Sequence, residues 1–168
     1  MNVRIMFIVA VLTSAMVGLA VSFGKSDAQT AKDVVGTWTV VSNVTDQGGK
    51  KTEPYGANPK GIMVLDANGR YVLTVARPAL PKFASNNRTT GTAEENSAVI
   101  QGSISHFGTY SVSEADKTIN FRIETSTFPN WDGTEQKRSF TLTGDELKYT
   151  IATGSGGGTV LVVWKRAK

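Results

Sequence analysis

Short stretches of alternating apolar and polar residues follow one another from Val35 to the end of the chain, separated by clusters of turn-forming residues. They are rich in Val, Ile, Thr, Tyr and Phe, which favour extended backbone, and their spacing is typical of an antiparallel meander. Asn68 and Gly69, between two of these stretches, form the strongest hairpin signal. The predicted strands cover residues 35–44, 62–65, 71–75, 107–112, 118–125, 136–142, 147–151 and 159–164.

Eight antiparallel strands in a small domain would leave two unpaired edges if the sheet stayed open. Closing the sheet removes both edges and leaves an interior that can hold one small ligand. A chain of 168 residues has room for one such domain. We therefore predict an all-β fold, an eight-stranded antiparallel up-and-down barrel.

Residues 77–105 interrupt the meander with a connection that is too long for an ordinary hairpin loop. Thr92 is a predicted helix N-cap, Glu95 is its capping-box partner, and Gly102 predicts the end of the helix. Residues 98–100 supply an apolar face. We expect one short helix here, acting either as a lid at the barrel mouth or as a cover for one end of the core.

Residues 1–28 have the pattern of a secretory signal: one early positive charge, an apolar stretch over residues 5–23, and small residues ending at Ala28. Cleavage before Gln29 would give a periplasmic or secreted domain over residues 29–168, with no membrane span left. The alternative is an uncleaved anchor, because the apolar stretch approaches the roughly 20 residues that cross a bilayer.

Composition removes several classes of function. The sequence has no cysteine, which excludes disulfides, a thiolate nucleophile and cysteine-based metal sites, and which fits a bacterial periplasm. Without residues 1–28, 16 basic and 13 acidic residues give a net charge of +3. Because the basic residues are scattered and form no basic face, we expect no nucleic-acid partner.

Gly36 and Trp38 form a Gly-x-Trp at the start of the first predicted strand, which resembles the signature of lipocalins. An ordered set of further motifs resembles the bacterial lipocalin-like domain family over roughly residues 35–165. This resemblance implies an up-and-down barrel and small-molecule binding. The motifs are Pro54-Tyr55-Gly56, Asn58-Pro59-Lys60-Gly61, Arg77-Pro78, Phe83-Ala84-Ser85, Gly91-Thr92, Gly108-Thr109-Tyr110, Phe128-Pro129-Asn130-Trp131, Gly133-Thr134, Gln136, Arg138 and Val163-Trp164.

Trp38 is large enough to close the narrow end of a barrel, and we expect it to be a core residue. A cation near the C-terminus, Lys165 or Arg166, could stack over its ring.

Alternation along the strands predicts which side chains face the interior, because residues two apart share one face. The predicted wall is mostly apolar and is expected to include Leu161. The candidate ligand-binding residues are Tyr71, Leu73, Val75, Arg77, His106, Tyr110, Phe121, Trp131, Gln136, Arg138, Phe140 and Tyr149.

Two of these residues, Arg77 and Arg138, would be inward cations. A buried arginine without a partner is costly, so each predicts either an ion pair, with Glu124 or Asp132 as candidates, or an anionic ligand.

His106 is the single histidine, so no cluster of histidines can hold a metal, and we expect no metal and no cofactor. The segment from Phe128 to Trp131 is interpreted either as a rim contact or as a packed corner. Residues 154–158 lack the ending of a phosphate loop and are interpreted as a flexible turn that needs no particular backbone conformation.

The leading functional hypothesis is binding of a small hydrophobic or amphipathic molecule, such as a fatty acid. One alternative is an isomerase, cyclase or hydrolase that uses His106 with Tyr110 or an arginine as acid, base or oxyanion donor. Another is a filled barrel with no cavity.

Export predicts a defined N-terminus. When the full chain is produced in a bacterium, the protein of the extracytoplasmic fraction should begin at Gln29, as measured by intact mass. Ala28→Leu should block this cleavage, because signal peptidase requires a small residue there. Ala31→Leu, beyond the site, should not. Recovery of the uncleaved chain from the membrane would support the anchor instead.

Overall fold

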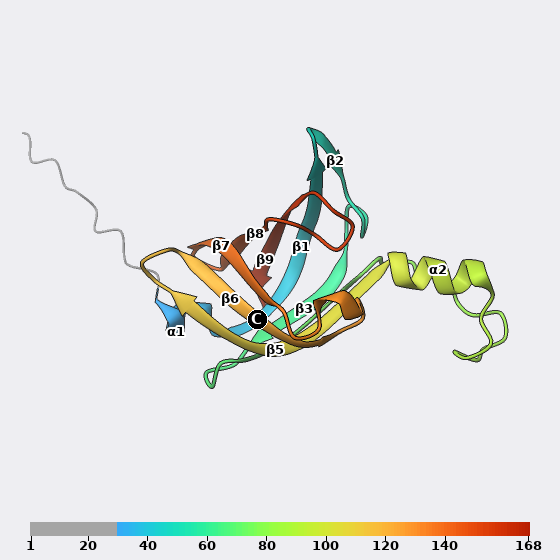
Figure 1. The fold of residues 1–168 in the computed structure, drawn as a ribbon, viewed down its shortest axis with the longest axis horizontal. Helices are drawn as coiled ribbons and strands as arrows, with labels where there is room; N and C mark the ends of the chain where they lie inside the picture. Colours follow the sequence, from blue (N-terminus) through green and yellow to red (C-terminus); the bar gives the residue numbers. More distant parts are fainter. Residues whose placement is uncertain (1–29) are drawn as a thin grey trace, which may run out of the picture.

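The computed structural model describes residues 30–168 (Figure 1). The predicted signal and its cleavage site lie outside these residues. The elements in order are α1 (Ala31–Val34), β1 (Gly36–Gln47), β2 (Lys50–Thr52), β3 (Lys60–Leu65), β4 (Arg70–Ala76), α2 (Ala93–Gln101), β5 (Ser103–Ser113), β6 (Thr118–Ser126), the 3-10 turn η1 (Pro129–Trp131), β7 (Glu135–Thr143), β8 (Glu146–Ile151) and β9 (Thr159–Arg166).

The described strands form a closed antiparallel barrel. From β3 to β9 each strand pairs with the next, and β1 pairs with both β3 and β9. The predicted eight-stranded up-and-down barrel is therefore confirmed, with strand ends shifted by a few residues. The unpredicted β2 pairs with the end of β1 alone, and its all-polar sequence Lys50–Thr52 gives no alternating pattern.

The core lies inside the barrel and follows the alternation of the strands. Along β4, Tyr71, Leu73 and Val75 are buried, whereas their neighbours face solvent. On β9, Val160, Val162 and Trp164 are the inward residues. The expectation that Leu161 lines the wall is wrong: it lies between two inward residues and is 44% exposed.

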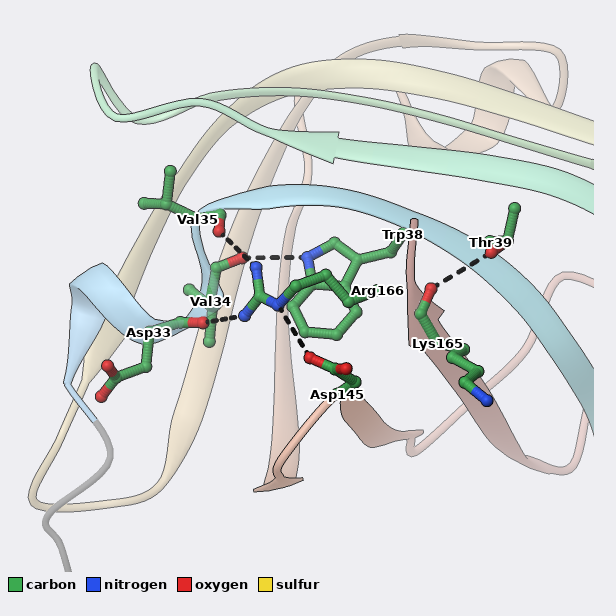
Figure 2. A network of polar contacts seen from close by, with 8 residues as sticks. All are labelled: Asp33, Val34, Val35, Trp38, Thr39, Asp145, Lys165 and Arg166. Carbon is green, nitrogen blue, oxygen red and sulfur yellow. Dashed lines mark hydrogen bonds and ion pairs between the residues drawn. The ribbon is translucent and has the colours of Figure 1, made fainter. Parts of the chain in front are cut away.

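One end of the barrel is closed by a network around Trp38 (Figure 2). The indole Nε1–H donates to the carbonyl of Val34 at 3.0 Å, and the Arg166 guanidinium lies 4.2 Å from the centre of the Trp38 ring. Arg166 also donates to the carbonyls of Val35 and Asp33, at 2.8 and 2.6 Å. The predicted cation over Trp38 is thus confirmed, with Arg166 as the residue.

The same network explains the glycine of the Gly-x-Trp motif. Gly36 has a φ of +141°, and a Cβ placed there would lie 2.6 Å from Nη1 of Arg166. A side chain at this position would displace the guanidinium from the carbonyl of Val35. Both residues of the motif therefore serve the same contact: Gly36 leaves space for the guanidinium of Arg166, and Trp38 supplies the ring on which it stacks.

The predicted helix is present as α2, with its N-cap at Thr92, a capping box with Glu95 and its C-cap at Gly102. Its proposed position as a lid or a cover is wrong. None of its residues is buried, Ile100 is 66% exposed, and the helix projects away from the barrel (Figure 1). Its apolar residues are too few to hold it against the barrel. Across residues 30–168, no helix has the length and apolar character to cross a membrane.

The closed end predicts a specific stability effect. Arg166→Met should lower the free energy of unfolding by about 1–3 kcal/mol, because the carbonyls of Val35 and Asp33 lose a charged donor and Trp38 loses its cation. Lys165→Met, on the adjacent exposed position of β9, should change it by less than about 0.5 kcal/mol. Urea denaturation measures both, and equal effects would contradict the role of Arg166.

Candidate functional site

The barrel contains a cavity of about 380 Å³. Its walls come from β1, β4, β5, β7, β8 and β9, and its rim from β2, the end of α2, η1 and the connection between β8 and β9. All these rim segments lie at the end of the barrel opposite Trp38. The barrel is therefore closed at one end and hollow toward the other.

Arg138 is the central polar residue of this cavity. It faces inward from β7, as predicted, and has no exposed surface. Its guanidinium packs against two neighbouring rings, 4.5 Å from the centre of Phe121 and 4.9 Å from that of Tyr149. Nη2 donates to Oε1 of Gln136 at 2.8 Å. These contacts fix the guanidinium in one orientation.

The two predicted carboxylate partners of Arg138 bind elsewhere. Glu124 forms an ion pair with Arg70 on the outer surface, and Asp132 accepts a hydrogen bond from the backbone N–H of Ser126. Within residues 30–168, Nε and Nη1 of Arg138 have no hydrogen-bond partner. The arginine is therefore a buried cation that the described acidic groups do not neutralise.

Two more polar atoms of the cavity wall are also buried without a hydrogen-bond partner in the described chain. They are Nε1 of Trp164 and Oδ1 of Asn43. Burial raises the pKa of Tyr149, and the charge of Arg138 together with weak hydrogen bonding from Trp164 and Arg138 to its hydroxyl opposes the shift. These donors lie near the Tyr149 hydroxyl but form no hydrogen bond of normal geometry with it, and the wall adds one acceptor without a partner among the described residues, Oδ1 of Asn43.

His106 lines the cavity from β5, two strands away from Arg138 on β7. Its Nδ1 shares a hydrogen bond of 2.9 Å with the hydroxyl of Tyr71. The centres of the His106 and Trp131 rings lie 5.7 Å apart, and the two rings are nearly perpendicular. Burial, and secondarily the cation of Arg138, lowers the pKa of His106 to about 3. The imidazole is therefore neutral at physiological pH and serves as a hydrogen-bonded wall residue.

The aromatic turn and the glycine-rich connection both contribute to the rim. Phe128 and Trp131, whose ring centres lie 5.6 Å apart in an edge-to-face arrangement, both line the cavity at its rim. The expectation that residues 154–158 need no particular conformation is wrong. Gly158 has a φ of +72°, and a Cβ there would lie 2.5 Å from the carbonyl oxygen of Asp46.

The structure places Arg77 and Tyr110 outside the cavity. Arg77 follows the last residue of β4, is exposed, and donates from Nε to the carbonyl of Pro54, so its predicted inward position is wrong. Tyr110 donates its hydroxyl proton to the carbonyl of Asp66 toward the closed end. The suggested pair of His106 and Tyr110 is therefore not formed, and Tyr71 is the hydroxyl that meets the imidazole.

Of the other candidates, Phe121 and Phe140 are core residues and Gln136 is the acceptor for Arg138. The candidates that the structure brings together around the cavity are Leu73, Val75, His106, Trp131, Arg138 and Tyr149. Sequence reasoning missed Asn43, Tyr55 and Trp164. Alternation along β9 could have predicted that Trp164 faces the interior. Alternation could not predict Asn43, which follows the register shift of β1, or Tyr55, which lies in a connection between strands.

Three known proteins or families are similar to this chain. Residues 35–167 match the family described as lipocalin-like domain. A 4'-hydroxy-3'-methoxypropiophenone carrier protein from Aspergillus oryzae is 30% identical over 82 residues, which are 45% of this chain and 74% of that protein. A crystal structure of a mutant of the fluorescent protein UnaG has 10% identity and a TM-score of 0.38, covering 82% of this chain and 99% of its own.

The lowered pKa of His106 predicts a pH dependence of stability. An unfolded histidine titrates near 6.5, so between about pH 6.5 and 3 the unfolded chain binds a proton that the folded chain does not. Stability falls as the pH falls through this window, and His106→Phe removes that contribution. The wild type should therefore lose more stability than the variant between pH 7 and about pH 4.5 in urea denaturation. Parallel losses would contradict a neutral His106.

Proposed function

The chain belongs to the lipocalin-like domain family, and from this premise we propose that it is an exported protein that binds a small hydrophobic or amphipathic molecule inside its barrel. The resemblance of the ordered sequence motifs to a lipocalin-like domain is confirmed over residues 35–167, while a bacterial origin stays a prediction. Export, to the periplasm or the medium, rests on the signal-like residues 1–28.

The observation that carries this proposal is the cavity. Its volume of about 380 Å³ falls within the range of small-molecule sites, at the lower end of roughly 300–1,000 Å³. Most of its inner wall is apolar or aromatic, with few polar groups, which is the composition of such sites. The apolar wall residues are Leu73, Val75, Ile104, Ile151, Val160 and Val162, and the aromatic ones are Tyr55, Phe128, Trp131, Tyr149 and Trp164.

The carrier protein of Aspergillus oryzae supports the same proposal. The molecule in its name combines an aromatic ring with hydroxyl, methoxy and ketone groups, and is therefore small and amphipathic. A molecule of this type matches a cavity that combines aromatic walls with unpaired polar groups.

The two alternatives from the sequence have less support. The cavity argues against a filled barrel. An enzyme using His106 would depend on an imidazole whose pKa of about 3 makes it a weak base, and on Tyr110, whose hydroxyl binds the carbonyl of Asp66.

Binding in the cavity can be tested with N-phenyl-1-naphthylamine, a neutral dye that fluoresces in apolar surroundings. Val75→Trp would place a large side chain in the cavity and should weaken dye binding by about tenfold or more. Val72→Trp, on the outer face of the same strand, should bind like the wild type. Fluorescence titration gives the three dissociation constants.

Thermal denaturation checks that each variant is folded, and Val162→Trp repeats the experiment from β9 if Val75→Trp is not. No saturable dye binding to the wild type, or equal binding by a folded cavity-filling variant, would contradict a ligand site inside the barrel.

A further inference from the structure

Four buried polar atoms without a hydrogen-bond partner belong to residues of the cavity wall. They are Nε and Nη1 of Arg138, Nε1 of Trp164 and Oδ1 of Asn43. One more such atom occurs within residues 30–168, Oγ1 of Thr118, and it does not line the cavity. Buried polar groups in folded proteins are nearly always hydrogen-bonded, so their gathering around one cavity indicates a site built for a polar ligand group.

The charge of the site is as informative as its hydrogen-bonding capacity. Among the described residues, Arg138 is the one permanently charged side chain that lines the cavity. His106 is neutral there because its pKa is about 3, and burial raises the pKa values of Tyr55 and Tyr149, which keeps both hydroxyls protonated. A buried cation is stable when an anion offsets its desolvation, and no protein anion lines this cavity.

The contacts of Arg138 leave defined atoms for a ligand. Phe121 and Tyr149, whose ring centres lie 6.1 Å apart, both pack against the guanidinium, and Gln136 accepts a hydrogen bond from Nη2. Nε and Nη1 remain, and both donate and cannot accept. The group that binds them must therefore be an acceptor, and the uncompensated charge favours an anionic one.

One arginine balances one negative charge. A phosphate monoester carries about −1.5 to −2 charges at neutral pH and would leave an excess of buried charge. A carboxylate or a phenolate carries a single charge on compact oxygen acceptors.

Resting on the proposed function, we propose that the ligand is a small monoanionic acid whose carboxylate or phenolate oxygen binds Arg138. The indole N–H of Trp164 is the second donor to this end of the ligand. Asn43 accepts a hydrogen bond from a hydroxyl substituent. The apolar body of the ligand lies along Leu73 and Val75, toward the aromatic rim.

The test uses two competitors of equal shape and different charge, 2-naphthoate and 2-naphthamide, each displacing N-phenyl-1-naphthylamine from the protein at pH 7.5. The wild type should bind the carboxylate about 30-fold more tightly than the amide or better, as expected when a buried charge gains its partner. Arg138→Met should reduce this preference to within about threefold. Arg122→Met removes an exposed arginine of the neighbouring strand and should leave the preference unchanged.

The ratio of the two dissociation constants is measured on the wild type, so the proposal can be contradicted even if the Arg138→Met variant folds poorly. A second measurement is the NMR signal of the Trp164 indole proton, assigned with Trp164→Phe, which should shift downfield when 2-naphthoate binds. If the dye binds but the naphthoate displaces it no better than the amide, or does not displace it, the anionic ligand is wrong and the binding function stands. If the dye itself does not bind, the proposed function fails first.

Discussion

The whole structure depends on β1, because this strand closes the barrel. Its first residues pair with β3 while its middle and end pair with β9, over the interval from Trp38 to Asp46. Twelve residues are long enough for both pairings, and a register shift between Val40 and Ser42 bends the strand between them. With the edges joined, every inward side chain faces a common interior, and the plug of Trp38 and Arg166 leaves the opposite end for entry.

Two arginines on the barrel strands, Arg138 and Arg166, have contrasting roles. Arg166 donates hydrogen bonds to the carbonyls of Val35 and Asp33 and forms an ion pair with Asp145, so it stabilises the closed end. Arg138 keeps two nitrogens without a partner in the described chain. A residue arranged for structure alone would be satisfied by its neighbours, as Arg166 is. Binding sites commonly hold groups in a state that costs stability until a ligand arrives.

The sequence predicted the barrel well because the barrel is a local pattern repeated: alternation placed Leu73, Val75 and Tyr149 inside, and the capping box placed α2. It failed where a contact between distant segments decides the outcome. Arg77 lies outside the cavity because β4 ends at Ala76, so that the alternation of the strand no longer applies to it, and its Nε donates to the carbonyl of Pro54. The unpaired state of Arg138 could not be predicted, since it depends on where Glu124 and Asp132 find other partners. The alternation of apolar and polar residues does not show which side chains form ion pairs or hydrogen bonds across the barrel.

The segment that carries α2 leaves the barrel at the end of β4 and returns to it at the start of β5, and these two strand ends are paired with each other. Ala76 pairs with Ser103, and the N–H of Arg77 donates to the carbonyl of Gly102 at 2.8 Å, so the barrel is complete below that point. The 24 residues from 78 to 101 form an appendage on one hairpin, and its length adds little to the entropy cost of closing the loop. Evolution can therefore exchange this appendage, and with it the approach to the mouth, without redesigning the barrel.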